Sequence, residues 1–290
     1  MALSAGLLGG AACFAGSMGA TDLDLMHDGL FLGLGANYNS INTTQDSWGK
    51  GISTVVLNGT LTSGVAQGTG APFHDTVTAF SPEIQVGYFK HFRNTQNLYG
   101  LKFSYQYLGS TATNSNLYIP QTGVSTSGGI TSTLFGYVNA DSVQITTNHE
   151  MTLLAFMGRS FGNKYVYLGA GPSLFNMQSK NYYSIGYALD AGETLDVTGL
   201  VSYSSPSIWA WGGAAQLGMT YFFNPTWFID ASYTYSITGS YTTSHQQTFA
   251  NTGQVSGAIP YTTSGTLYTK DTLFLNTQAI ALSINKVFDL

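Results

Sequence analysis

The chain of 290 residues carries few charges, since only 8% of its residues are Asp, Glu, Lys or Arg, against about 25% in an average globular protein. The body of the chain has no run of about eighteen apolar residues, which excludes a membrane-spanning helix there. The net charge of −5 gives no reason to expect nucleic acid as a partner. A β-barrel with an apolar outer face and a polar lumen accounts for a membrane protein of this composition.

The first twenty residues, 1–20, are predicted to be a secretory signal peptide. Leu3–Phe14 is apolar and small residues follow it, so that cleavage after Ala15 or after Ala20 fits the pattern. The usual positively charged start is missing, so the signal is expected to be truncated at its beginning. The single cysteine, Cys13, falls in this segment, and the mature chain, residues 21–290, is therefore expected to form no internal disulfide.

Eight tracts of alternating polar and apolar residues follow, and each is predicted to be a β-strand with two different faces. The pattern is clearest in the third tract, where Tyr99, Leu101 and Phe103 alternate with Lys102 and Ser104. The fourth and fifth tracts are partly apolar on both faces. We expect Leu153 and Met157 to point outward in the fourth, and Val166 and Leu168 in the fifth. The predicted strands are Gly29–Ile41, Ser81–Phe92, Leu98–Leu108, Thr147–Phe161, Tyr165–Met177, Ile208–Phe223, Trp227–Ile237 and Thr272–Phe288.

The gaps between these tracts alternate strictly between long and short. The short gaps are Arg93–Asn97, Gly162–Lys164 and Asn224–Thr226, and the long ones are Asn42–Phe80, Ser110–Thr146, Gln178–Pro206 and Thr242–Lys270. A chain that crosses a membrane eight times, with tight turns on one side and long loops on the other, produces this order. Backbone amides in hydrocarbon have no water to bond, so the sheet must close without an edge. We therefore predict one all-β domain, an eight-stranded antiparallel up-and-down transmembrane β-barrel.

Aromatic residues gather beside the predicted tight turns, as they do in the interfacial girdles of membrane barrels. The alternative is that they form the core of a soluble sandwich, and their position at strand ends argues against it. The predicted girdle consists of Tyr88, Phe92, Tyr99, Phe161, Tyr165, Tyr221, Phe223, Trp227 and Phe288.

Four charged residues, Glu83, Lys102, Glu150 and Asp230, are predicted to face the lumen. Lys102 and Asp230 each lie about five residues beyond a tight turn, which places them at a similar depth. A buried unpaired charge is costly, so we predict a salt bridge or a shared hydrogen-bond network between them. The favoured interpretation is a structural plug of the lumen, and the alternative is a gate or ion path.

Three segments of this pattern resemble the OmpA-like family of small outer-membrane barrels. Gly29–Tyr38 is similar to the usual first strand, Val166–Gly171 to the glycine-rich fifth strand, and Ala281–Phe288 to the terminal strand. The resemblance implies that the barrel-assembly machinery reads the terminal strand. That signal normally ends on its aromatic residue, whereas here Asp289 and Leu290 follow Phe288.

We expect no metal, cofactor or enzymatic activity, because the five histidines show no metal-ligand spacing and no catalytic set can be inferred. The expected protein lies in the outer membrane of a Gram-negative bacterium, with extracellular loops and periplasmic termini. Its expected role is structural and in adhesion or recognition, with outer-membrane lipid and lipopolysaccharide, and a host or phage surface ligand, as partners. A narrow porin-like channel for small solutes and a lipid A-modifying enzyme are the alternatives.

Overall fold

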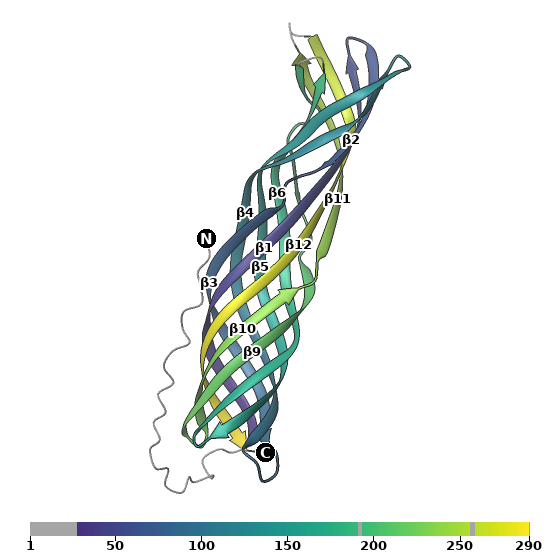
Figure 1. The fold of residues 1–290 in the computed structure, drawn as a ribbon. Helices are drawn as coiled ribbons and strands as arrows, with labels where there is room; N and C mark the ends of the chain where they lie inside the picture. The colour runs from purple at the N-terminus through teal and green to yellow at the C-terminus, as the bar shows by residue number, and fades with distance from the viewer. Residues whose placement is uncertain (1–27, 191–192, 256–258, 290) are drawn as a thin grey trace, which may run out of the picture.

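A computed structural model describes residues 28–190, 193–255 and 259–289 (Figure 1). The predicted signal peptide, residues 1–20, lies outside the described residues. Within the described part, the chain forms strands only, and no helix is long and apolar enough to span a membrane. The strands are β1 (Gly29–Leu57), β2 (Thr60–Thr69), β3 (Phe73–His91), β4 (Asn97–Ser127), β5 (Ile130–Phe161), β6 (Lys164–Asp190), β7 (Glu193–Asp196), β8 (Val201–Ser204), β9 (Ile208–Asn224), β10 (Trp227–Thr238), β11 (Tyr241–Val255) and β12 (Ile259–Asp289).

Eight of these strands close into a ring, and every pair in it is antiparallel. The order around the ring is β1, β3, β4, β5, β6, β9, β10 and β12, and β12 pairs with β1 to complete it. The predicted fold, an eight-stranded antiparallel barrel, is therefore confirmed. The short turns and the end of β12 lie at one end of the barrel, which we call the turn end, and the long hairpins form the opposite hairpin end (Figure 1).

The four segments that were predicted as long loops are largely strands. β1 and β12 stay paired from Gly29 and Asp289 up to Leu57 and Tyr261. β2, β7 and β8 lie wholly within the predicted loops, and so does β11 except for its first residue, Tyr241. These segments are rich in Thr, Ser and Val, which suit the pleated backbone, although outward-facing residues there are mostly polar. These segments were predicted as loops because the alternation of apolar and polar residues is lost beyond the belt, although the strands continue.

The outer face of the ring carries an apolar belt next to the turn end. On β1 the belt runs from Leu30 to Tyr38, which are 42% and 56% exposed, a length close to the roughly 9–11 residues that a membrane-spanning strand needs. Outward-facing residues beyond it, such as Asn42 and Thr44, are polar. The faces predicted for the fourth and fifth strands are confirmed, since Met157 and Leu168 are exposed on this belt.

Candidate functional site

The lumen is filled by side chains, and its turn end is closed by an apolar cluster that we call the aromatic floor. Its rings touch one another, as Phe222 and Phe228 do with ring centroids 5.0 Å apart, and Phe31 and Phe228 at 5.4 Å. The aromatic floor consists of Phe31, Phe89, Leu98, Phe156, Tyr165, Tyr167, Phe222, Phe228 and Val287.

Tyr165 was predicted as a girdle residue, and this prediction is wrong. Tyr165 is only 2% exposed and packs in the aromatic floor, 5.7 Å from the ring of Phe89. Because Val166 faces outward, alternation along β6 sends Tyr165 inward. The other predicted girdle residues lie on the outer face or are partly exposed there: Tyr88, Phe92, Tyr99, Phe161, Tyr221, Phe223, Trp227 and Phe288.

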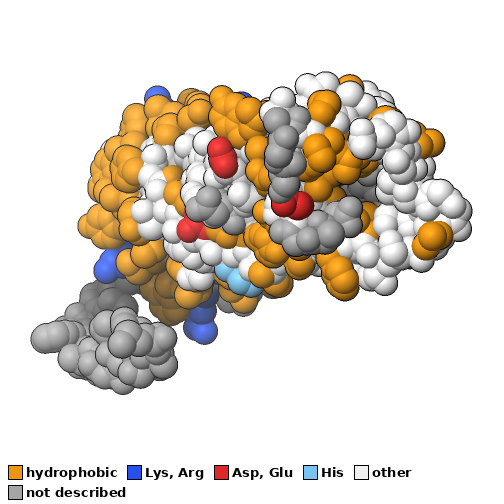
Figure 2. Space-filling model, turned by 90° about the horizontal axis from the view of Figure 1, so that it is seen from above, with side chains coloured by type: hydrophobic (Ala, Val, Ile, Leu, Met, Phe, Trp, Pro, Cys, Tyr) orange, Lys and Arg blue, Asp and Glu red, His pale blue; other side chains and the backbone are white. Residues whose placement is uncertain are grey.

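Basic residues accompany these aromatics at the turn end. Arg159, Lys164 and Lys286 lie over the rings of Phe161, Tyr221 and Trp227 at 5.6, 5.7 and 5.7 Å. In contrast, a view onto the hairpin end shows acidic side chains facing the viewer and Lys or Arg only at the margin (Figure 2). An ammonium or guanidinium over an aromatic ring suits the boundary between hydrocarbon and water.

Above the aromatic floor, Lys102 and Asp230 meet across the lumen. Lys102 Nζ lies 3.2 Å from Asp230 Oδ2, and the two side chains are only 3% and 5% exposed. Tyr167 joins the pair, because its hydroxyl accepts a hydrogen bond from Lys102 at 2.8 Å and donates to Asp230 Oδ2 at 2.9 Å. Thr220 donates a further hydrogen bond to Asp230 at 3.0 Å. The pairing expected of Lys102 and Asp230 is present, and it draws in uncharged residues that the sequence did not indicate.

The two remaining lumen carboxyls, Glu83 and Glu150, are joined by two amides. Asn37 donates to Gln106 at 2.7 Å, Gln106 donates to Glu150 at 2.7 Å, and the other end of the Asn37 amide lies 3.0 Å from Glu83. Each amide turns its nitrogen to one neighbour and its oxygen to the other. One of the two carboxyls must therefore face an amide oxygen and carry a proton. The four hydrogen-bonded side chains are then satisfied with a single negative charge.

A fourth buried acid of the described residues, Asp271, lies nearer the hairpin end than the apolar belt and was not predicted. It accepts hydrogen bonds from Ser47 at 2.6 Å and Gln45 at 3.0 Å. Burial raises the pKa of the Asp271 carboxyl, and these two hydrogen bonds offset part of that rise. It was missed because it sits at the boundary between a predicted loop and the predicted strand Thr272–Phe288.

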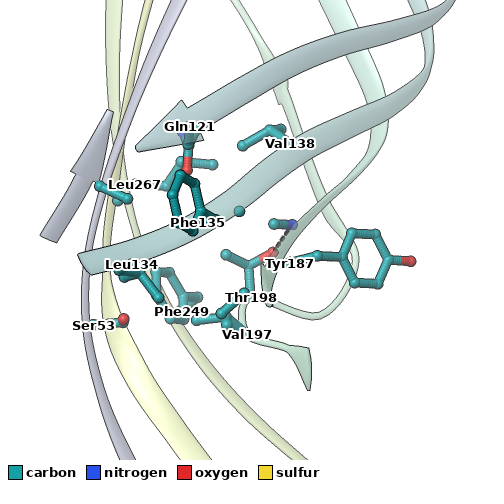
Figure 3. A pocket seen from close by; sticks show the side chains of 15 residues that line it. Ser53, Gln121, Leu134, Phe135, Val138, Tyr187, Val197, Thr198, Phe249 and Leu267 are labelled. Carbon is teal, nitrogen blue, oxygen red and sulfur yellow. Dashed lines mark hydrogen bonds between the residues drawn. The ribbon is translucent and has the colours of Figure 1, made fainter. Parts of the chain in front are cut away.

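A small cavity lies in the hairpin end (Figure 3). Leu134, Val197 and Phe249 line it, and Thr198 accepts a hydrogen bond from the backbone of Gly186 beside it. Its volume of about 40 Å³ admits only one or two molecules the size of water, so it is too small to hold an organic ligand.

Comparison with known proteins gives weak similarities only. No protein-family model and no curated protein matches the chain. Among solved structures it is similar to the outer membrane protein OprG from Pseudomonas aeruginosa, with 11% identity over 91% of this chain and 98% of that chain and a TM-score of 0.36. It is also similar to Neisserial surface protein A, with 11% identity, coverages of 86% and 97% and a TM-score of 0.29. A third is Ail of Yersinia pestis in complex with the heparin analogue sucrose octasulfate, with 12% identity, coverages of 79% and 98% and a TM-score of 0.27.

TM-scores this low carry no argument about this chain, and the barrel fold rests on the pairing of its own strands. Within the described residues, the lumen holds three apolar clusters and, between them, buried polar groups that include the Lys102–Asp230 pair and the hydrogen bond from Gln106 to Glu150. Such a filling stabilises a closed barrel, and it leaves the paired charges buried rather than lining a water-filled path.

Proposed function

We propose that the chain is an outer-membrane barrel of the OmpA-like kind, plugged along its lumen, that holds a β-structured hairpin body outside a Gram-negative cell. The observation that carries this proposal is the apolar belt around a filled lumen. An outward face of exposed Leu, Ile, Tyr and Trp side chains would be costly in water and is suited to lipid. In this orientation, the turn end, where β1 begins and β12 ends, faces the periplasm.

The proposed role is structural, with recognition at the cell surface. Continuous strand pairing into the hairpins, to Leu57 and Tyr261 on β1 and β12 and to Ser127 and Ile130 on β4 and β5, makes the exposed part rigid enough to present a fixed surface. A host or phage surface ligand would bind at the hairpin end. Outer-membrane lipid and lipopolysaccharide would contact the belt, and the barrel-assembly machinery would read β12.

The filled lumen argues against a narrow channel for small solutes. A solute path would have to cross the aromatic floor and then break the Lys102–Asp230 pair, both of which are closed by direct contacts. We therefore expect planar-bilayer recordings of the purified barrel to show no discrete openings. Reproducible openings of the wild-type protein would restore the channel.

Surface labelling of whole cells tests the proposed orientation. Single cysteines at the hairpin-tip residues Gly59 and Gly129 should react with a membrane-impermeant maleimide on intact cells, whereas a cysteine at Asn94 in a turn should react only after the outer membrane is permeabilised. Labelling of Asn94 but not the tips in intact cells would contradict the orientation. Absence of the protein from the outer-membrane fraction would contradict the location.

A further inference from the structure

Three side chains meet at the turn end of the lumen in an arrangement that the structural role does not require. Asp28 Oδ1 lies 2.6 Å from Nδ1 of His91, and Nε2 of His91 lies 2.8 Å from Oγ of Ser160. Asp28 precedes β1, His91 ends β3, and Ser160 is the penultimate residue of β5. The barrel register therefore brings together an acid, an imidazole and a hydroxyl that are 63 and 69 residues apart in sequence.

Several contacts hold this arrangement in place. The backbone N–H of His91 also donates to Asp28 Oδ1, at 2.9 Å, so that the carboxylate is fixed to both the main chain and the ring. The ring of His91 packs edge-on against Phe89 of the aromatic floor, with centroids 6.4 Å apart. Ser160 is anchored through its backbone N–H, which donates to the carbonyl of Gln96 at 2.7 Å.

The hydrogen bonds also determine the direction of proton transfer. An ionised carboxylate can only accept, so Nδ1 of His91 must be its donor. In the neutral imidazole Nε2 then carries the lone pair, and the hydroxyl of Ser160 must donate to it. This is the tautomer in which an imidazole removes a proton from a serine nucleophile.

We propose that Ser160, His91 and Asp28 form a nucleophilic site that hydrolyses short-chain carboxylic esters presented at the turn end. Ser160 Oγ attacks the ester carbonyl and passes its proton to His91 Nε2. The bond to the leaving alcohol breaks, and that alcohol takes the proton from His91. A water molecule then gives a proton to His91 and attacks the acyl-serine, which releases the acid and returns the proton to Ser160, so no oxidant or reductant is needed.

The surroundings of Ser160 define the substrate class. Ser160 points into the lumen and is 6% exposed, so lipid on the outer face cannot reach it. Towards the hairpin end, the aromatic floor fills the space, with Phe89, Tyr165 and Phe222 in mutual contact at 5.7 to 6.2 Å. His91 and Asp28 are 21% and 36% exposed, which leaves the turn end as the side of access. These limits favour a short acyl group, such as acetyl, over a fatty acyl chain.

The full barrel, refolded in detergent micelles, should react with a fluorophosphonate probe at Ser160, as located by peptide mass spectrometry. It should hydrolyse p-nitrophenyl acetate, and p-nitrophenyl octanoate at least about tenfold more slowly. S160A should abolish labelling, and H91Q should reduce the acetate rate by about 10² to 10⁴, the usual contribution of a general base. D28N should lower kcat with little change in KM, and D28E should restore part of the rate, because Asp28 acts by positioning His91.

S104A is the matched control, since Ser104 is a lumen serine whose Oγ bonds Thr152 at 2.6 Å rather than a histidine. It should leave labelling and hydrolysis unchanged. Heat-modifiable migration on a denaturing gel will show that each variant is folded. A folded wild-type barrel that is not labelled at Ser160, or that hydrolyses p-nitrophenyl acetate no faster than the S160A variant does, would overturn the proposal.

Discussion

Breaking the buried pair between Lys102 and Asp230 should destabilise the barrel more than the loss of any ordinary hydrogen bond. At the observed 3.2 Å and an effective dielectric constant of about 20, the attraction between the two charges is about 5 kcal/mol. Both side chains are at most 5% exposed, so solvent screens the pair little and the abandoned charge would stay buried. K102M or D230N alone should therefore lower the free energy of unfolding by about 3–5 kcal/mol.

The double variant K102M/D230N should lose less stability than either single variant, because no uncompensated charge remains and Thr220 and Tyr167 can still bond the new amide. Urea unfolding in lipid vesicles, followed by tryptophan fluorescence, measures all three free energies and the coupling between the two sites. Single-variant losses below about 1 kcal/mol, or a double-variant loss equal to the sum of the two, would refute the role of the pair.

The same unfolding assay checks three further predictions. E150Q should change the free energy of unfolding by less than about 1 kcal/mol, because a carboxamide can replace the carboxyl beside Gln106, whereas E150L should lower it by about 1–3 kcal/mol, because Gln106 loses its acceptor. Equal losses for the two variants would exclude a single proton held between Glu83 and Glu150. Because the pKa of Asp271 is raised in the folded state, the folded protein keeps this proton at pH values where the unfolded chain has lost it, and the free energy of unfolding should fall as pH rises from the unfolded pKa of 3.8 to the folded pKa. D271N should remove this pH dependence, and an unchanged dependence would contradict the prediction. G218V should lower the free energy of unfolding by about 1–3 kcal/mol, because a Cβ at Gly218 would overlap the ring of Tyr167, whereas G213V on the same strand, where the nearest atom would lie 3.9 Å away, should lower it less. Equal losses would show that the lumen is not tightly packed at Gly218.

The course of the barrel could be predicted because a wall between lipid and lumen imposes a two-residue rhythm on every strand. The same alternation correctly predicted that Met157 and Leu168 face outward. Applied to Tyr165 it would have placed that residue inside, but Tyr165 was assigned to the girdle because it lies next to a turn. The hairpins were missed because both of their faces are partly polar outside the belt. One signal was present: Asn58 and Gly59 form a tight turn with φ of 49° and 78°, the pair that most strongly indicates a two-residue hairpin.

The lumen network could be predicted only in its charges. Lys102 and Asp230 were expected to pair because an unpaired charge in the lumen is costly, but nothing local marks Tyr167 as their partner or Gln106 as the partner of Glu150. The cluster of Asp28, His91 and Ser160 could not be predicted at all. Its members come from three different strands or strand ends, and only the register of β1, β3, β4 and β5 brings them together.

A plugged barrel in a membrane requires that residues along β12 alternate between contact with lipid and burial in the lumen. Spin labels at single cysteines placed at residues 279 to 284, in a background without Cys13, can be probed in bilayers with oxygen, which partitions into lipid, and with a water-soluble nickel chelate. We predict high oxygen accessibility at Ile280, Leu282 and Ile284, and low accessibility to both reagents at Ala279, Ala281 and Ser283. Access of the nickel chelate to all six positions, or no alternation between them, would contradict a plugged barrel in a membrane.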